Sequence, residues 1–173
     1  SLARDQRKIL AEGERAQLLL REEGSSAAFP EALEQVNLDI ANVAERLEEA
    51  DVGKLTLVIE QEIVISLEEM VAALVQVQKD NQEKQQQRQS GQPQAGQPGE
   101  QPLVDKLAEL RLIRTLQVRI NNRTNTLSEL LADPADPIGQ AAEGDVLEQL
   151  RGLAERQSSI QQVTRDIVVG KGE

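Results

Sequence analysis

The side chains in this sequence that could do chemistry are chiefly carboxylates and guanidiniums. Its 173 residues include 30 Asp and Glu and 19 Lys and Arg, but no His, Cys, Tyr or Trp. The usual proton shuttle, the thiolate nucleophile and the His–Asp relay are therefore excluded. Paired glutamates are most often solvated charges on exposed helices, and the Glu-x-x-His pattern of di-iron bundles cannot occur. The sequence thus favours a protein that is not an enzyme and has no cofactor or metal site.

A second group of candidates consists of four arginines and one asparagine: Arg111, Arg114, Arg119, Arg123 and Asn122. The segment 103–128 around them holds five basic and two acidic residues, whereas the segment 31–83 holds thirteen acidic and three basic ones. The arginines could form a docking surface for an anionic partner or a membrane surface. Alternatively, they pair with four glutamates of the same bundle: Glu60, Glu62, Glu68 and Glu69. The second interpretation is favoured, because isolated surface ion pairs are weak while complementary charge selects which helices pair.

The segment "RINNRTNT" at 119–126 is unusually polar for the middle of a helix. It is either a binding patch or a solvated face. The solvated face is favoured because Ile120 and Leu127 keep the apolar phase of the helix. Asn122 to Thr124 also matches a glycosylation sequon, a match that is frequent by chance.

The composition limits which classes of partner the protein can bind. A net charge of -11 and a single aromatic residue exclude nucleic acid as the main partner, which needs clustered basic residues and stacking aromatics. No run of about 18 apolar residues is present, so no membrane span is expected in this segment. The chain starts at Ser1 without Met, which is compatible with a removed targeting peptide or anchor.

These residues require helices to position them. The first helix ends before Gly24 and is weakened by Gly13 in its middle. Pro30 suits the first position of a second helix, and Gly53 suits the left-handed residue that ends it. Its apolar residues recur at intervals of three and four: Leu33, Val36, Ile40, Val43 and Leu47. This spacing predicts a helix–helix seam.

The third segment is rich in β-branched residues between Thr56 and Ile65, which could favour a strand. A helix is predicted instead, because one apolar face continues from Ile59 to Val77 without a turn residue. Further apolar residues broaden this face and predict that the helix has more than one neighbour: Val58, Ile65, Val71 and Val75.

Two more helices follow a Gln-, Pro- and Gly-rich segment at about 88–102, which is predicted to be a flexible connector. The fourth helix begins at Pro102 and ends near Leu131, and Asp145 opens the fifth, whose seam Gln157 interrupts as a register-setting or rim residue. The predicted fold is all-α: an elongated bundle of about five helices, forming one domain over 1–173, with a long antiparallel helical hairpin.

Several blocks carry a resemblance: "DQRKILAEGERAQLLLREEGSSAAFPEAL", "EEMVAALVQVQKDNQ", the Gln-rich run, "QPLVDKLAELRLIRTLQVRINNRT" and "RQSSIQQVTRDIVVG". Together they resemble a family of uncharacterised helical proteins of planctomycete-type bacteria. The resemblance implies a periplasmic or cell-envelope protein associated with proton-channel components of the ExbB/TolQ type and their ExbD/TolR partners, as in a biopolymer-transport complex. It implies no catalytic residue.

The sequence therefore predicts a non-catalytic helical scaffold or accessory subunit that binds one or more proteins through an apolar and acidic helix face. Self-association and a cytoplasmic location both stay open. The alternative is a bundle that binds a small ligand or lipid in a cavity between its helices.

Overall fold

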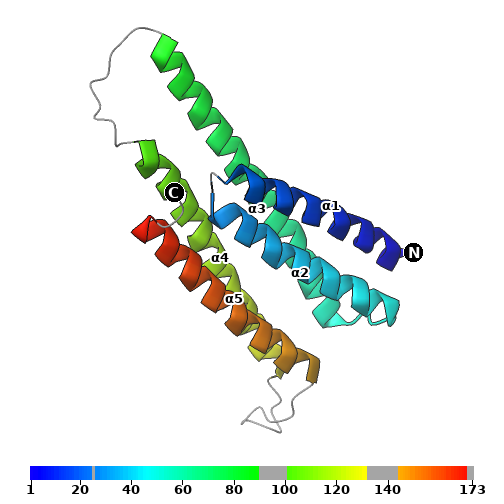
Figure 1. Ribbon diagram of the computed structural model, residues 1–173. Helices are drawn as coiled ribbons and strands as arrows, with labels where there is room; N and C mark the ends of the chain where they lie inside the picture. Colours follow the sequence, from blue (N-terminus) through cyan, green and yellow to red (C-terminus); the bar gives the residue numbers. More distant parts are fainter. Residues whose placement is uncertain (25, 90–100, 132–143, 171–173) are drawn as a thin grey trace. The chain divides into compact units, whose positions relative to one another are not determined.

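The computed structural model describes residues 1–24, 26–89, 101–131 and 144–170. Five helices occupy these ranges: α1 Leu2–Glu23, α2 Ala28–Glu48, α3 Lys54–Gln89, α4 Gln101–Leu131 and α5 Gly144–Val169 (Figure 1). No strand occurs in this part of the chain, which confirms the all-α helical bundle and the helix over Thr56–Ile65. The expected connector at 88–102 falls mainly on 90–100, outside the described residues. The elongated shape and the long hairpin stay predictions.

The chain divides into two compact units, Ser1–Leu112 and Ile113–Glu173, with the boundary inside α4. The single domain expected over 1–173 stays a prediction. In the first unit, α2 contacts both α1 and α3. The carboxylate of Glu109, in the third turn of α4, accepts a hydrogen bond of 2.8 Å from the Ala27 N–H just before α2.

The core of the first unit is built around α2, which has twelve buried residues. Four of the five predicted seam residues, Leu33, Val36, Ile40 and Val43, are buried, whereas Leu47 is half-buried; Phe29 in the first turn is buried as well. A matching stripe on α3 is buried at intervals of four or seven residues: Leu55, Ile59, Ile63 and Met70. These intervals keep the side chains on one helical face, so burial of this face holds the unit together.

Both ends of α2 differ from the sequence prediction. The helix begins at Ala28, so Pro30 lies within the first turn, where the ring removes no intrahelical hydrogen bond. The Phe29 N–H donates instead to Ser26 Oγ (3.2 Å). At the other end, the left-handed residue is Ala50, with φ of 59°, and not Gly53. The helix ends at Glu48, four residues before the Val52–Gly53 stop that the sequence suggests, so the reversal of the chain falls on Ala50.

The second unit contains the later part of α4 and the whole of α5, and these two helices run antiparallel. The amides of Gln117 and Gln157 donate to one another, at 2.7 and 2.8 Å. Arg123 donates a hydrogen bond to Gln149 (2.7 Å). Arg123 lies six residues after Gln117 on α4, and Gln149 lies eight residues before Gln157 on α5. The buried apolar residues of both helices recur mainly every seven residues: Ile113, Ile120 and Leu127 on α4, and Val146, Leu153, Ile160 and Ile167 on α5. The polar pairs therefore set the register of two matching heptad seams.

Candidate functional site

Helix α3 has apolar residues on two opposite faces. One face carries the buried stripe from Leu55 to Met70 described above. Five large apolar side chains outside that stripe are exposed by 43–59%: Leu57, Val64, Ile65, Val71 and Val75. They form what we call the outer stripe of α3. Its exposure shows that the described residues of its own unit, 1–24, 26–89 and 101–112, leave it uncovered.

The spacing of these residues explains why they form a continuous surface. Leu57, Val64 and Val71 are seven residues apart, which is almost two helical turns, and Val75 follows one turn later. Ile65 widens the stripe beside Val64. A partner helix packing on this face would meet a heptad-like row of β-branched and leucine side chains, the usual surface of a helix–helix seam.

The outer stripe lies in an acidic environment. Between residues 55 and 78, α3 contains four glutamates and no lysine or arginine. Glu60 and Gln61 line a shallow, open depression together with Val64 and Ile65. Glu68 is exposed one turn beyond Val64 on the same face. The stripe is therefore an apolar surface with carboxylates at its edges and within it.

The sequence-predicted docking residues differ in exposure. Arg111, Arg114 and Asn122 are exposed and Arg119 is half-buried, whereas Arg123 is 1% exposed. Arg123 therefore presents no free guanidinium to an anionic surface; it donates to Gln149 on α5 (2.7 Å). A signal for this burial was present in the sequence, because position 123 lies three residues after Ile120 and four before Leu127, in the apolar seam. Pairing of the arginines with glutamates of α3 stays a prediction.

The Asn-rich segment of α4 exposes Asn121, Asn122 and Asn125. The hydroxyl of Thr124 donates to the carbonyl of Ile120 (2.8 Å), and that of Thr126 donates to the carbonyl of Asn122 (3.1 Å). Hydroxyls that bond back to the preceding turn are satisfied within the helix. The two threonines thus form part of the helix surface, and a ligand role for the asparagines stays a prediction.

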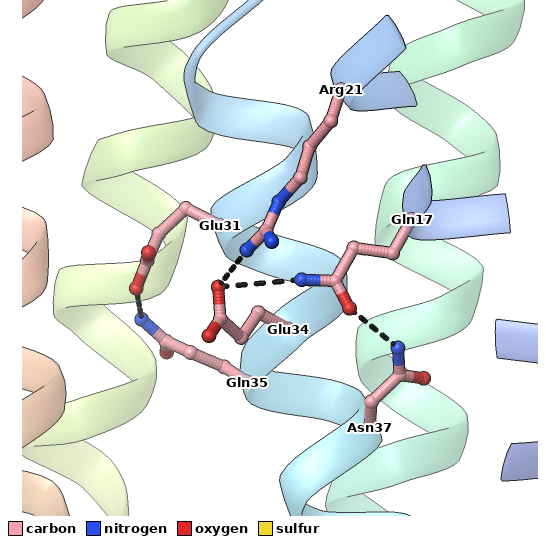
Figure 2. Close-up of polar contacts among 6 residues, drawn as sticks. All are labelled: Gln17, Arg21, Glu31, Glu34, Gln35 and Asn37. Atoms are coloured by element: carbon pink, nitrogen blue, oxygen red, sulfur yellow. Dashed lines mark hydrogen bonds and ion pairs between the residues drawn. The ribbon is translucent and has the colours of Figure 1, made fainter. Parts of the chain in front are cut away.

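A polar network joins α1 to α2 (Figure 2). Glu34 on α2 accepts hydrogen bonds from Arg21 (2.5 Å) and Gln17 (3.3 Å), and Gln17 in turn accepts one from Asn37 Nδ2 (3.1 Å). The carboxylate can only accept, so the Gln17 amide must turn its NH₂ group to Glu34 and its oxygen to Asn37. The negative charge of Glu34 thereby sets which group donates and which accepts in each of these hydrogen bonds.

The network ends in a close approach at Gly13, the glycine that weakens α1. Asn37 is 6% exposed, and its Oδ1 has no hydrogen-bond partner among the described residues. A Cβ on Gly13 would lie 2.1 Å from this oxygen. Gly13 therefore leaves the space that the Asn37 amide occupies, with a Cα–H directed at Oδ1 as in weak Cα–H···O contacts. The sequence indicated only the cost of this glycine to the helix.

A second polar link between α1 and α2 is the ion pair of Arg7 with Glu48. The guanidinium donates through Nε (2.5 Å) and Nη2 (2.7 Å) to the two carboxylate oxygens. The hydrogen bond from Arg7 lowers the pKa of Glu48 below its ordinary value, with a smaller contribution from the positive charge. Both side chains are about half exposed, so this pair aligns the helices more than it stabilises them.

Within the described ranges, no three Asp and Glu side chains gather as a metal site. No helix in these ranges has the length and hydropathy needed to cross a membrane. No protein-family model matches the sequence, and comparisons with curated proteins and solved structures give no significant match. The resemblance to a helical family of planctomycete-type bacteria therefore stays a prediction.

Proposed function

We propose that this protein is a non-catalytic helical scaffold that binds another protein through the outer stripe of α3. One observation carries the proposal: α3 already buries an apolar stripe from Leu55 to Met70, yet the five side chains of the outer stripe are exposed by 43–59%. A helix that needs only one partner has polar residues on its remaining surface. The second apolar surface is explained if a second helix covers it.

The size of the stripe indicates a modest affinity. Full burial of a Val, Leu or Ile side chain contributes roughly 1.5–3 kcal/mol, so covering side chains that are already half-buried would contribute roughly 1 kcal/mol each. Five such side chains would give a total of about 5 kcal/mol before the cost of association, which corresponds to weak binding. The apolar residues alone would therefore support a reversible contact, and polar groups at its edge would have to strengthen it.

Two further expectations belong to this proposal. The resemblance implies a location in the periplasm or cell envelope and an association with proton-channel components. Cell fractionation with an antibody against the protein tests the location, and recovery in the cytoplasmic fraction alone would contradict it. The alternative of a ligand- or lipid-binding bundle receives less support, because the depression at Val64 and Ile65 is open on the surface of one helix.

Site-specific photocrosslinking in cells tests the scaffold. A photoreactive residue at Val71 should give an adduct with a helical segment of one protein, identified by mass spectrometry. The substitution Val64→Ser, two turns away on the same stripe, should weaken the adduct strongly. The same photoreactive residue at Leu18, which is 57% exposed on α1, is the matched control and should give no such adduct. An equal yield of adduct from Val71 and Leu18, or a yield at Val71 that Val64→Ser does not change, would contradict the proposal.

A further inference from the structure

We propose that the occupant of the outer stripe is an amphipathic helix whose apolar seam is flanked by lysine or arginine. This inference rests on the proposed function and adds the chemistry of the partner. Its starting point is the distribution of charge along α3: Lys54 and Lys79 lie at the two ends of the apolar segment, and all four charged residues between them are glutamates.

The positions of two glutamates make them direct recognition groups. Glu60 lies one turn before Val64 and lines the same depression, and Glu68 lies one turn after it. Side chains four residues apart on a helix are neighbours on its surface. A partner side chain that packs on Val64 would therefore bring its flanking residues close to both carboxylates. Lysine or arginine at these flanking positions would form charge-assisted contacts, as e and g residues do in coiled coils.

A second copy of this chain fits the stripe less well. In a parallel pair, Glu60 would face Glu60, and in an antiparallel pair centred on Val64, Glu60 would face Glu68. Like charges that face one another across a helix pair are destabilising, and the net charge of -11 adds to the repulsion. The same charge disfavours an anionic lipid surface. Complementary charge therefore selects a basic helix.

The dimensions of the stripe set the length of this helix. From Leu57 to Val75 the axial rise is roughly 27 Å, at about 1.5 Å per residue. A partner would need about five turns of continuous helix to cover all the stripe residues. Its basic residues should concentrate in the middle of the helix, because Glu60 and Glu68 lie inside the stripe while Lys54 and Lys79 lie at its ends.

The test uses the full chain and three synthetic 21-residue helical peptides. The peptides share one Leu/Val heptad seam and differ only at the central flanking positions, which carry Lys, Gln or Glu. Binding is measured by fluorescence anisotropy at low and high salt. We expect the Lys peptide to bind at least tenfold more tightly than the Glu peptide, and this ratio to shrink in high salt.

Two variants separate charge from apolar contact. The double substitution E60K/E68K should reverse the preference, so that the Glu peptide binds at least tenfold more tightly than the Lys peptide. The double substitution V64S/V71S should weaken every peptide at least tenfold. Leu18→Ser, at an exposed position on α1, is the control and should change nothing. Circular dichroism verifies that each variant stays helical, and E60Q/E68Q, which should abolish the preference, replaces the lysine variant if that one unfolds.

Four results would overturn the inference. Equal binding of the three peptides, with sensitivity to V64S/V71S, would leave the scaffold standing but remove the basic partner. Dimerisation in analytical ultracentrifugation that V64S/V71S abolishes would make a second copy the occupant. If the chain binds vesicles of anionic lipid and V64S/V71S abolishes this binding, the occupant of the outer stripe is a membrane surface. If no peptide binds, the basic helix is also rejected, and the crosslink at Val71 decides separately whether the scaffold stands.

Discussion

Asn37 Oδ1 lies 2.1 Å from the position that a Cβ on Gly13 would take. This relationship explains a glycine in the middle of a 22-residue helix. The amide of Asn37 is held in place by its hydrogen bond to Gln17, so its oxygen remains directed at the α1 backbone. Gly13 and Asn37 together fix which turn of α1 lies against which turn of α2.

Replacing this glycine tests the relationship directly. Helix propensity favours Ala over Gly by about 1 kcal/mol, so Gly13→Ala would stabilise α1 if space were available. We expect Gly13→Ala instead to lower the free energy of unfolding by about 1–2 kcal/mol, because the methyl group displaces a buried, hydrogen-bonded amide. Urea denaturation followed by circular dichroism measures the change.

The chain provides a matched control in Gly152 of α5, where an added Cβ meets nothing within 4 Å. Gly152→Ala should raise the free energy of unfolding by about 0.5–1 kcal/mol. In addition, Gly13→Ala should become favourable in an Asn37→Ala background, since the truncated side chain vacates the space. Equal effects of Ala at positions 13 and 152 would contradict the close approach.

A second prediction concerns Ala50, the non-glycine residue with positive φ after α2. Left-handed backbone costs an L-residue about 1–2 kcal/mol, and glycine avoids most of this cost. We expect Ala50→Gly to raise the free energy of unfolding by about 0.5–1 kcal/mol after the larger entropy of the unfolded chain is included. Ala72→Gly, at an exposed position inside α3, should have the opposite sign, and a thermal-unfolding comparison of the two variants distinguishes them.

A third prediction follows from the lowered pKa of Glu48. The folded chain favours the ionised carboxylate, so this contribution to stability is fully present above the ordinary pKa of 4.5. It is lost as the pH falls through the lower pKa of the folded state. Unfolding measured between pH 3 and 7 should therefore show that Glu48→Gln lies below the parent chain at neutral pH and converges with it in acid. Glu49→Gln, at the adjacent exposed position, is the control for the loss of one negative charge.

A fourth prediction concerns the reciprocal amide pair of Gln117 and Gln157. Each substitution by Ala should cost about 0.5–1 kcal/mol, and the double variant should cost little more than either single one, because the first change already removes both hydrogen bonds. A double-mutant cycle in urea measures this coupling. Gln161→Ala, at an exposed position on α5, should lie within about 0.5 kcal/mol of the parent, and additive effects at 117 and 157 would refute the pairing.

The helices could be predicted because their signals are local. The seam from Leu33 to Val43 is buried as its spacing indicates, and the β-branched run at Thr56–Ile65 is helical because its apolar phase never breaks. The sequence also predicts that Ile65, Val71 and Val75 broaden the apolar surface of α3, but it does not single out Leu57 and Val64, and the predicted Val58 is half-buried. The exposure of this surface could not be predicted, since the sequence does not say which neighbour a stripe meets.

Other features depend on which residues meet across helices. The spacing of residues within α1 cannot show that Asn37 of α2 lies against Gly13. The sequence therefore indicates only that this glycine lowers the helix propensity of α1. Residue type predicts the left-handed position at Gly53, whereas the structure places it at Ala50 because α2 ends early. Charge alone groups Arg123 with Arg111, Arg114 and Arg119, although its heptad position belongs to the buried seam.

The shallow attachment of α1 has a consequence for motion. Among the residues of α1 only Ala3 is buried, and its ion pairs with α2 at Arg7 and Arg21 join side chains that are about half exposed. Segments with few buried apolar contacts open locally at low free energy. Amide protons of α1 should therefore exchange with deuterated solvent well before those of α2, which would make α1 the first part of the chain to detach and return.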